Sequence, residues 1–265
     1  MFKRKFSVFN KDWRGYLLKL RWRAAKGLAP RRRVEARGLS LTLQCDNWIT
    51  HYRFATINSK ERETLDWIDA HVKEGGLFFD IGANIGVYCL YAALRHPLIR
   101  VVAFEPEFSN LHLLRDNVAE NGLKERIQIY AIALGNRSGL SLLHIQDFTP
   151  GAALHTVSEL PLTQTLSRKS VVGREGVWVM TLDAFCEETN LVPQAIKLDV
   201  DGNEWEVLEG ASRTLSDPQL RTVLVEAEGG ENRTQCEEIL GDAGFRCQWR
   251  DPMRKSHNQI WLRNG

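Results

Sequence analysis

The chain has 265 residues, of which 43% are hydrophobic and 26% are charged, as in a globular protein of one large α/β domain or two small ones. Its five cysteines are scattered and include no C-x-x-C pair, which argues against a disulfide framework or a zinc knuckle and favours a reducing compartment. No apolar run approaches the roughly 20 residues of a membrane span, and no signal-peptide segment follows the basic start, so we expect a cytoplasmic protein.

Positive charge gathers at the N-terminus. Residues 1–37 contain 13 Lys and Arg and 2 acids, a charge of +11 in a chain whose total is +2. Trp13, Leu17 and Leu20 fall on one helical face, which predicts a basic amphipathic arm joined by a linker at residues 30–33 to a domain at 38–265. Such an arm can contact the inner face of a membrane peripherally, pack on its own acidic domain, or remain a loose tail; nucleic acid is an unlikely partner.

Strand and helix patterns alternate along the domain. An alternating strand at 39–43 is expected to pair with 48–54 as a hairpin lid, and the stretch 147–176 has little periodicity, so we interpret it as the substrate-side loop. Asp183 is expected to cap a helix. Further strands are predicted at 77–79, 101–104, 127–132, 140–145, 178–182, 195–198, 222–225, 245–249 and 259–262, with helices at 60–72, 87–94, 111–118, 205–211 and 236–241. This alternation predicts a doubly wound, mostly parallel sheet.

A glycine loop follows the first core strand. The strand ends at Asp80, and Gly82, Asn84 and Gly86 follow before an apolar helix. The dinucleotide fingerprint fails because Asn84 and Val87 stand where it needs glycine, and no Gly-Lys-Ser/Thr of a Walker loop is present. The remaining pattern resembles the first motif of methyltransferases that use S-adenosylmethionine (SAM).

Glu105 ends the next core strand, somewhat over 20 residues after the loop. An acid at this distance is placed to bind both hydroxyls of a ribose. The alternative is that Asp80 and Glu105 are ordinary loop acids and that the glycines serve only a turn, but the combination favours a cofactor site.

A second acidic group, Asp199, Asp201 and Glu204, lies where another core strand becomes a helix. Ligands bind beyond the carboxyl ends of parallel strands, so these acids are predicted to share an edge with the glycine loop. They could hold Mg²⁺ together with Glu226, or one could act as a general base. Alternatively, Asp201 and Glu204 only start a helix favourably.

Together these motifs resemble the FkbM family of SAM-dependent methyltransferases, over residues 79–86, 103–106, 133–135, 181–183 and 196–211. The resemblance implies a class I (Rossmann-like) methyltransferase fold, in which a doubly wound seven-stranded sheet is mostly parallel and its last strand antiparallel. It also implies SAM as cofactor and O-methyl transfer to a hydroxyl of a sugar in a surface glycan or of a natural product.

The sequence departs from the family in two ways. Asp201 and Asn203 stand where the last motif more often has Glu and His. No carboxylate follows the third core strand, so backbone groups of Ala133 and Leu134 are left to bind adenine. The missing histidine leaves open a non-catalytic SAM-binding protein, and the basic arm leaves open a protein or RNA methyltransferase. His144 and His155 are other available bases, although each is more often a surface residue.

Overall fold

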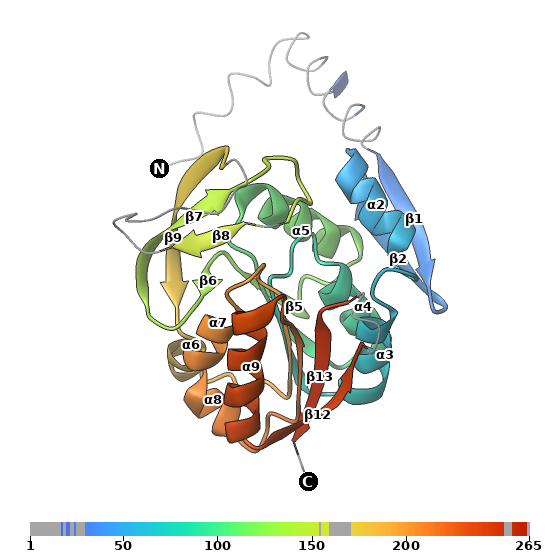
Figure 1. The fold of residues 1–265 in the computed structure, drawn as a ribbon. Helices are drawn as coiled ribbons and strands as arrows, with labels where there is room; N and C mark the ends of the chain where they lie inside the picture. The colour runs from blue at the N-terminus through green and yellow to red at the C-terminus, as the bar shows by residue number, and fades with distance from the viewer. Residues whose placement is uncertain are drawn as a thin grey trace, which may run out of the picture.

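The computed structural model describes residues 17, 20, 21, 24, 30–153, 155–158, 171–251 and 256–263. Most of the predicted arm at 1–37 and the middle of the predicted loop at 147–176 lie outside these residues. The described part of the chain consists of a large sheet covered by helices, a smaller sheet at one end of it, and an N-terminal hairpin at its side (Figure 1).

The large sheet has seven strands among the described residues, in the order β12-β13-β11-β10-β3-β4-β5. The neighbours from β11 to β5 are parallel, whereas β13, last in the chain, is antiparallel to both of its neighbours. The predicted doubly wound sheet with an antiparallel last strand is therefore confirmed. The strands are β3 (Leu77–Ile81), β4 (Arg100–Phe104), β5 (Ile127–Tyr130), β10 (Ala195–Leu198), β11 (Thr222–Glu226), β12 (Phe245–Arg250) and β13 (Asn258–Arg263).

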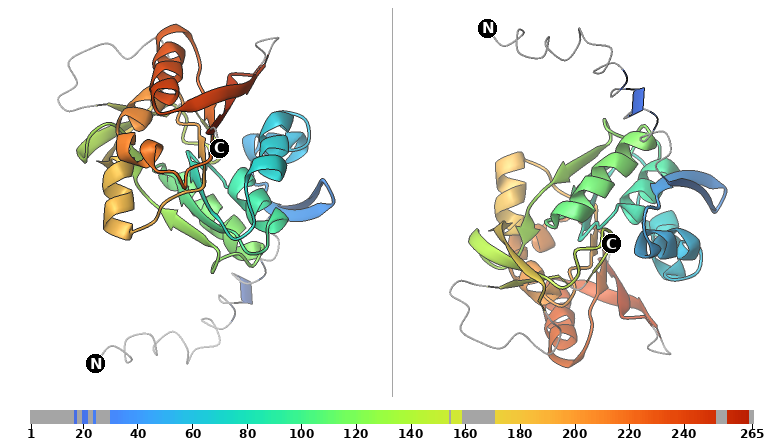
Figure 2. Two further views of the ribbon diagram at one scale, coloured as in Figure 1. Left: turned by 90° about the horizontal axis from the view of Figure 1, so that it is seen from below. Right: turned by 90° about the horizontal axis from the view of Figure 1, so that it is seen from above.

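Helices cover both faces of this sheet, because successive strand residues point to opposite sides. Phe78 packs against Trp67 on one face, whereas Phe79 packs against Phe185 on the other. Figures 1 and 2 show the two helical layers. None of the described helices is both long and apolar enough to cross a membrane. The first layer holds α3 (Arg62–His71), α4 (Val87–Arg95) and α5 (Phe108–Glu120), and the second holds α6 (Leu182–Thr189), α7 (Glu204–Glu209), α8 (Ser212–Ser216) and α9 (Gly230–Asp242).

The N-terminal hairpin consists of β1 (Arg31–Ala36) and β2 (Leu39–Gln44). The predicted linker at 30–33 is therefore wrong, since residues 31–33 begin β1 and pair with 42–44. Two asparagines, one in α5 and one at its C-cap, fasten the hairpin: Oδ1 of Asn117 accepts from the backbone N–H of Gln44 at 2.8 Å, and Oδ1 of Asn121 accepts from that of Thr42 at 2.9 Å. The boundary expected between the arm at 1–37 and the domain at 38–265 lies in the turn between β1 and β2.

Residues 48–54 form part of a helix, α2 (Trp48–Thr56), and the strand predicted there is wrong. The helix begins with a capping box in which Asn47 Oδ1 accepts from the backbone N–H of Thr50 at 3.0 Å and Thr50 Oγ1 accepts from that of Asn47 at 3.2 Å. This local pairing satisfies N–H groups that a helix start otherwise leaves open, and it overrides the β-propensity of Trp, Ile and Tyr. α2 lies beside β1 at the side of the molecule (Figure 1).

A second sheet, with four strands among the described residues, has the order β6-β9-β7-β8. Its strands are β6 (Ala133–Leu134), β7 (Gly139–Ile145), β8 (Thr156–Ser158) and β9 (Gly173–Met180). The strands predicted at 140–145 and 178–182 lie in β7 and β9, or overlap them, and β7 and β9 pair antiparallel. Through β8, part of the predicted substrate-side stretch reaches the carboxyl edge of the large sheet.

Asp183 does not cap α6, contrary to expectation. Thr181 is the N-cap, and its Oγ1 accepts from the backbone N–H of Ala184 at 3.1 Å. The Asp183 carboxylate instead accepts from the backbone N–H groups of Arg213 (2.9 Å) and Thr214 (2.8 Å) at the start of α8. Asp183 therefore joins two helices of the second layer, which a local pattern does not reveal.

The close approach of the glycine loop to β10 predicts a specific loss of stability. Gly82 has a φ of +80°, and a Cβ there would lie 1.7 Å from the Asp199 carbonyl oxygen, whereas Gly122 has a φ of +70° and nothing within 4 Å of such a Cβ. Gly122→Ala should cost only the left-handed backbone, about 1–2 kcal/mol. We expect Gly82→Ala to lower the free energy of unfolding considerably more, as measured by urea denaturation. Equal losses in the two variants would contradict a tight contact at Gly82.

Candidate active site

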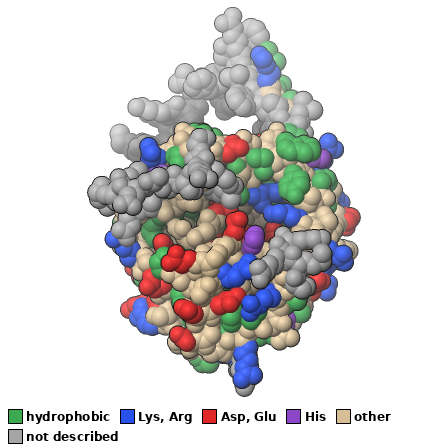
Figure 3. Space-filling view, in the orientation of Figure 1, with side chains coloured by type: hydrophobic (Ala, Val, Ile, Leu, Met, Phe, Trp, Pro, Cys, Tyr) green, Lys and Arg blue, Asp and Glu red, His purple; other side chains and the backbone are tan. Residues whose placement is uncertain are grey.

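A cavity opens at the carboxyl edge of the large sheet, where β3, β4 and β10 end. Figure 3 shows this side of the molecule hollowed near its centre, with carboxylate and cationic side chains around the hollow. Residues 152, 153, 155 and 157 cover the cavity and leave about 100 Å³ of open space. Cofactor sites commonly measure roughly 300 Å³ or more, so we expect this cover to move outward when a nucleoside cofactor binds.

The glycine loop forms one wall and is tied to the end of β4. The N–H groups of Gly82 and Ala83 both donate to the Phe104 carbonyl, at 3.0 and 2.9 Å. Gly82 lines the cavity, whereas Gly86 does not. Gly86 has a φ of +90° and is the N-cap residue of α4, so it turns the chain into the helix. Val87, the first residue of that helix, also lines the cavity.

Glu105 is buried at the end of β4, on the cavity wall. Its Oε1 accepts from the N–H of Glu107 at 2.9 Å and its Oε2 from that of Asn84 at 2.8 Å. Burial, with the charges of Glu107 and Asp201, raises the pKa of Glu105 to about 7 although these hydrogen bonds oppose the shift. Each oxygen keeps a lone pair for a ligand hydroxyl, which suits the ribose-binding role predicted for Glu105.

Asn84 lines the cavity, but its side chain holds the cover. Its Nδ2 donates to the Ala152 carbonyl at 2.7 Å, and Asn110 Nδ2 donates to the same oxygen at 3.1 Å. Asn110 Oδ1 also accepts from the N–H of Gly151 at 2.7 Å, and Arg53 Nε donates to the Gly151 carbonyl at 2.8 Å. Because its side chain is occupied in this way, we expect a cofactor to contact the backbone of Asn84, whose φ is +51°.

Asp80 lies behind the cavity wall and does not line it. It is fully buried, and neither carboxylate oxygen makes a well-formed hydrogen bond with a described residue. Burial raises its pKa to about 6, partly opposed by the charge of Lys197. Asp80 was predicted as a cofactor-binding residue, and the structure places it beneath the glycine loop instead.

A buried lysine supports the acidic edge. Lys197 Nζ donates to Asp199 Oδ2 at 2.8 Å and lies 4.9 Å from the centre of the Tyr88 ring. Burial alone would lower the pKa of Lys197, but the charges of Asp199 and Asp80 raise it, and Lys197 in turn lowers the pKa of Asp199 against the effect of burial. The charge of Asp199, followed by burial, raises the pKa of Glu226, and the pairing of the two carboxyl groups helps to lower that of Asp199.

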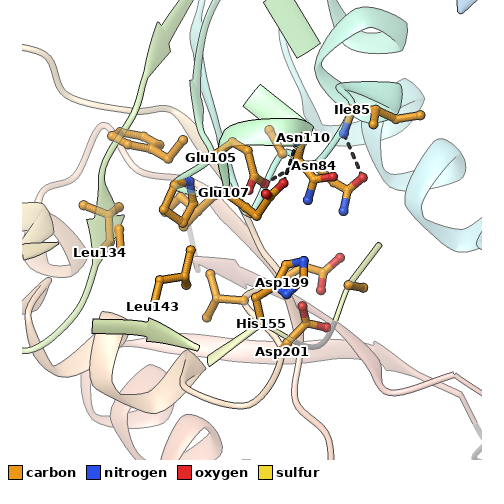
Figure 4. Close-up of a pocket in the computed structure, with 18 of the residues that line it drawn as sticks. Asn84, Ile85, Glu105, Glu107, Asn110, Leu134, Leu143, His155, Asp199 and Asp201 are labelled. Carbon is orange, nitrogen blue, oxygen red and sulfur yellow. Dashed lines mark hydrogen bonds between the residues drawn. The ribbon is translucent and has the colours of Figure 1, made fainter. Parts of the chain in front are cut away.

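Asp199, Asp201 and His155 come together on the side of the cavity opposite Glu105 (Figure 4). His155 precedes β8, and its Nε2 is buried without a hydrogen-bond partner among the described residues, while Nδ1 accepts from the N–H of Gln146 at 3.4 Å. Burial lowers the pKa of His155, so the imidazole is neutral at pH 7. Its place in the cavity could not be read from the sequence, because only the path of the 147–158 segment brings it there.

Glu204 does not line the cavity, although it was predicted beside Asp199 as a catalytic acid. It is buried at the start of α7, where its Oε1 accepts from the N–H groups of Val200 (3.0 Å) and Gly202 (3.1 Å). Its Oε2 accepts from Asn232 Nδ2 at 2.7 Å. All these partners are structural, so Glu204 fixes the turn that carries the cavity acids.

Asn203 stands where the family motif more often has histidine, and it lines the cavity. Its Nδ2 donates to the Val157 carbonyl at 3.2 Å, which joins the turn after β10 to β8. Asn203 therefore helps to fix the segment that carries His155. The cavity therefore does contain a histidine, His155, but it comes from the segment before β8 and not from position 203.

The other end of the cavity is apolar. Ala133, the predicted adenine-side residue, lines it together with Leu134, Leu143 and Phe104. Figure 4 shows Leu134 and Leu143 set apart from the group of Asp199, Asp201 and His155. A polar acidic end and an apolar end suit a cofactor that has a charged tail and a flat base.

The Mg²⁺ site considered from sequence is not supported. No group of three or more His, Cys, Asp or Glu side chains among the described residues is arranged to hold a metal ion. Asp199 is paired with Lys197, the pKa of Glu226 is raised by Asp199 and by burial, and Glu204 accepts hydrogen bonds from the turn that it holds. These residues do not fit a divalent cation, and we derive no step through one.

The comparisons with known proteins agree with this geometry. The family described as the methyltransferase FkbM domain matches residues 80–247. The chain belongs to the FkbM family of methyltransferases. It is an enzyme that transfers a methyl group from SAM, and the glycine loop, Glu105 and the acidic turn all lie within the matched range.

Two curated methyltransferases are similar to the chain. Methyltransferase sdnD of Sordaria araneosa is 27% identical over 210 residues, which cover 68% of this chain and 79% of the relative. The 31-O-demethyl-FK506 methyltransferase FkbM of Streptomyces tacrolimicus is 37% identical over 62 residues, 23% of this chain and 24% of the relative. Among solved structures, the FkbM methyltransferase of Methylobacillus flagellatus has a TM-score of 0.48 and 16% identity, over 71% of this chain and 43% of that one.

The raised pKa of Glu105 predicts that SAM binding depends on pH. The ionised carboxylate accepts hydrogen bonds from ribose hydroxyls. Protonation below about pH 7 removes its negative charge and about half of its capacity to accept hydrogen bonds. Affinity should therefore fall as the pH is lowered from 8 to 6, by at most about tenfold per pH unit. Calorimetry with Glu105→Gln provides the comparison, since this variant should bind more weakly and lack that part of the pH dependence. The same pH profile in both proteins would contradict the assignment.

Proposed function

We propose that this FkbM methyltransferase methylates a hydroxyl group of a small-molecule acceptor, with a sugar of a surface glycan or a natural product as the acceptor class. The observation that carries the proposal is the arrangement of one cavity: the glycine loop and Glu105 on one side face Asp199, Asp201 and His155 on the other (Figure 4). A hydroxyl needs its proton removed, and the carboxylates and imidazole of this second side are the groups among the described residues that we assign to that task.

The residues have distinct roles in this proposal. SAM supplies a methyl group already activated on a sulfonium, so the protein needs chiefly to align the acceptor oxygen, the methyl carbon and the sulfur. With Nδ1 accepting from Gln146, His155 carries its proton on Nε2 and donates to the acceptor oxygen, which orients it. Asp201 takes the hydroxyl proton as the C–O bond forms and the C–S electron pair passes to sulfur.

Asp199 is the weaker candidate for the base. Its ion pair with Lys197 at 2.8 Å, and to a smaller extent its hydrogen bond with Glu226, stabilise its charged form and reduce its basicity. A carboxylate such as Asp201 suffices as a base because the hydroxyl becomes strongly acidic once its oxygen begins to bond to the methyl carbon. Asp199 then adds negative charge near the cationic cofactor.

Substitution of the acceptor-side groups should separate transfer from SAM binding. We expect Asp201→Asn and His155→Gln each to lower kcat by about tenfold or more, in line with the loss of a general base or an orienting hydrogen bond, with little change in SAM affinity. The exposed Glu187→Gln serves as the control. Labelled SAM and a panel of sugar and polyketide alcohols give the assay, with calorimetry for SAM.

Three results would redirect the assignment. Full turnover in both variants would show that these side chains are not part of the catalytic machinery. Label transferred from extract into protein or RNA would favour a macromolecular acceptor held by the basic arm. SAM binding with no transfer to any fraction would favour a non-catalytic binding protein.

The proposal includes a cytoplasmic location with peripheral contact at the inner face of a membrane, through residues 1–37. The surface formed by β1 and α2 supports this contact. Arg32 and Arg33 are exposed on β1. On the adjacent α2, Trp48 (76% exposed) and Tyr52 (44%) project from the surface. Tryptophan and tyrosine favour the membrane interface, and basic residues are attracted to anionic lipids.

Liposome sedimentation of the full-length protein tests this contact. The double variant Trp48→Ser/Tyr52→Ser should pellet less with anionic liposomes, whereas Leu98→Ser, which changes another exposed apolar side chain (72%), should not. High salt should weaken the binding of the wild type as it screens the basic residues. If no protein pellets above the level without liposomes, the membrane contact is wrong.

A further inference from the structure

A second cavity lies at the opposite end of the large sheet, where the parallel strands begin. It has a volume of about 650 Å³ and is formed by the loop before β3, the starts of β4 and β11, and the end of β13. The left view in Figure 2 looks onto this end of the molecule. The loop contains Gly75 and Gly76, which bring bare backbone to the cavity wall. Nothing in the methyltransferase reaction described above uses this site.

The charges that line this cavity are all positive. Five basic side chains contribute to the lining, and no described carboxylate does. Gln194, Gln219 and Thr222 add uncharged polar groups. The five are His71, Lys73, Arg100, Arg221 and Arg263.

One of these cations is rigidly held. Arg263 donates from Nε to the Leu220 carbonyl at 2.9 Å, from Nη1 to the Ala243 carbonyl at 3.1 Å, and from Nη2 to the Leu215 carbonyl. Its guanidinium carbon lies 4.3 Å from the centre of the Phe245 ring. The positive charge is thus fixed on the wall, with no carboxylate in ion-pair contact among the described residues.

Two further arginines are available to a ligand. Arg100 and Arg221 are exposed, and their side chains make no hydrogen bond or ion pair with a described residue. Their backbones are fixed, because the Arg100 N–H donates to the Gly76 carbonyl at 3.1 Å and the Arg221 N–H to the Gln194 carbonyl at 2.9 Å. Anchored backbones with open guanidinium groups suit a site whose partner comes from outside the chain.

The cations also repel one another. Burial and then the charge of Arg221 lower the pKa of Arg263, with only Asp217 acting in the other direction. Burial and then the charge of Lys73 lower the pKa of His71, so its imidazole is neutral at pH 7 and the positive charge comes from the lysine and the three arginines. Like charges around one cavity are unfavourable, and a bound anion would relieve them.

We propose that this cavity binds a small molecule that carries two or more linked phosphate groups. Guanidinium groups at the start of β4, before β11 and at the end of β13 can each contact a different phosphate, and the planar fork of arginine matches phosphate oxygens in a bidentate manner. A single carboxylate or phosphate would engage only part of this set of cations. The cavity volume also lies in the range of small-molecule sites.

Calorimetry with inorganic triphosphate on the full-length protein tests the site. We expect saturable binding with one site per chain that weakens with salt, and an affinity reduced about tenfold or more in Arg100→Gln/Arg221→Gln. The control Arg115→Gln/Arg174→Gln removes the same charge from exposed positions that line neither cavity, and it should bind like the wild type.

SAM binding measured in the same variants should remain unchanged, which shows that they fold and separates this site from the first cavity. Equal triphosphate affinity in the two double variants, or binding that does not saturate, would overturn the proposal. Binding of a single-stranded RNA that displaces triphosphate and is tenfold or more tighter would also overturn it, because the ligand would then be a nucleic acid. Orthophosphate binding as tightly as triphosphate would reject the requirement for linked phosphates.

Discussion

The acidic edge of the sheet depends on the buried ammonium of Lys197. Asp199, Asp80 and Glu61 all raise its pKa, and each carboxylate in return gains a positive charge inside a region where unpaired charges are costly. Glu61 extends the arrangement, since it accepts from the Tyr88 hydroxyl at 2.7 Å and pairs with Lys60 at 2.8 Å. Because Lys197 comes from β10, between β3 and β11, it lies beneath the point where the glycine loop and the acidic turn meet.

The other acids at this edge have two kinds of role: some hold the backbone of the loops, and others face the cavity. Glu204 holds the turn after β10, and Glu105 holds the glycine loop while it also faces the cavity, so Asp199 and Asp201 can be presented to a ligand. The two ends of the sheet consequently differ in charge. Acids gather at the carboxyl edge, which suits a sulfonium cofactor, whereas the charged side chains among the described residues that line the cavity at the other end are basic.

Hydrophobic periodicity was sufficient to predict the sheet, because each core strand is a short apolar run that is buried on both faces, as in β3 and β11. It failed at α2, where a capping box outweighed β-propensity. For the site, Gly82, Glu105, Asp199 and Asp201 could be placed at one edge by counting strands. Asp80 and Glu204 could not be assigned correctly, since a local motif does not show whether a carboxylate faces a cavity or backbone N–H groups. Lys197 did leave a signal: a lysine inside an otherwise apolar core strand requires a buried anionic partner.

A crystal structure with bound S-adenosylhomocysteine would test the central claim most directly. We predict that the ribose hydroxyls contact Glu105, that the adenine lies against Ala133 and Leu134, and that the sulfur faces the group of Asp199, Asp201 and His155. The cover formed by residues 152, 153, 155 and 157 should be displaced outward, because about 100 Å³ does not accommodate the ligand. A ribose remote from Glu105, or a sulfur directed away from the three acceptor-side residues, would contradict this account.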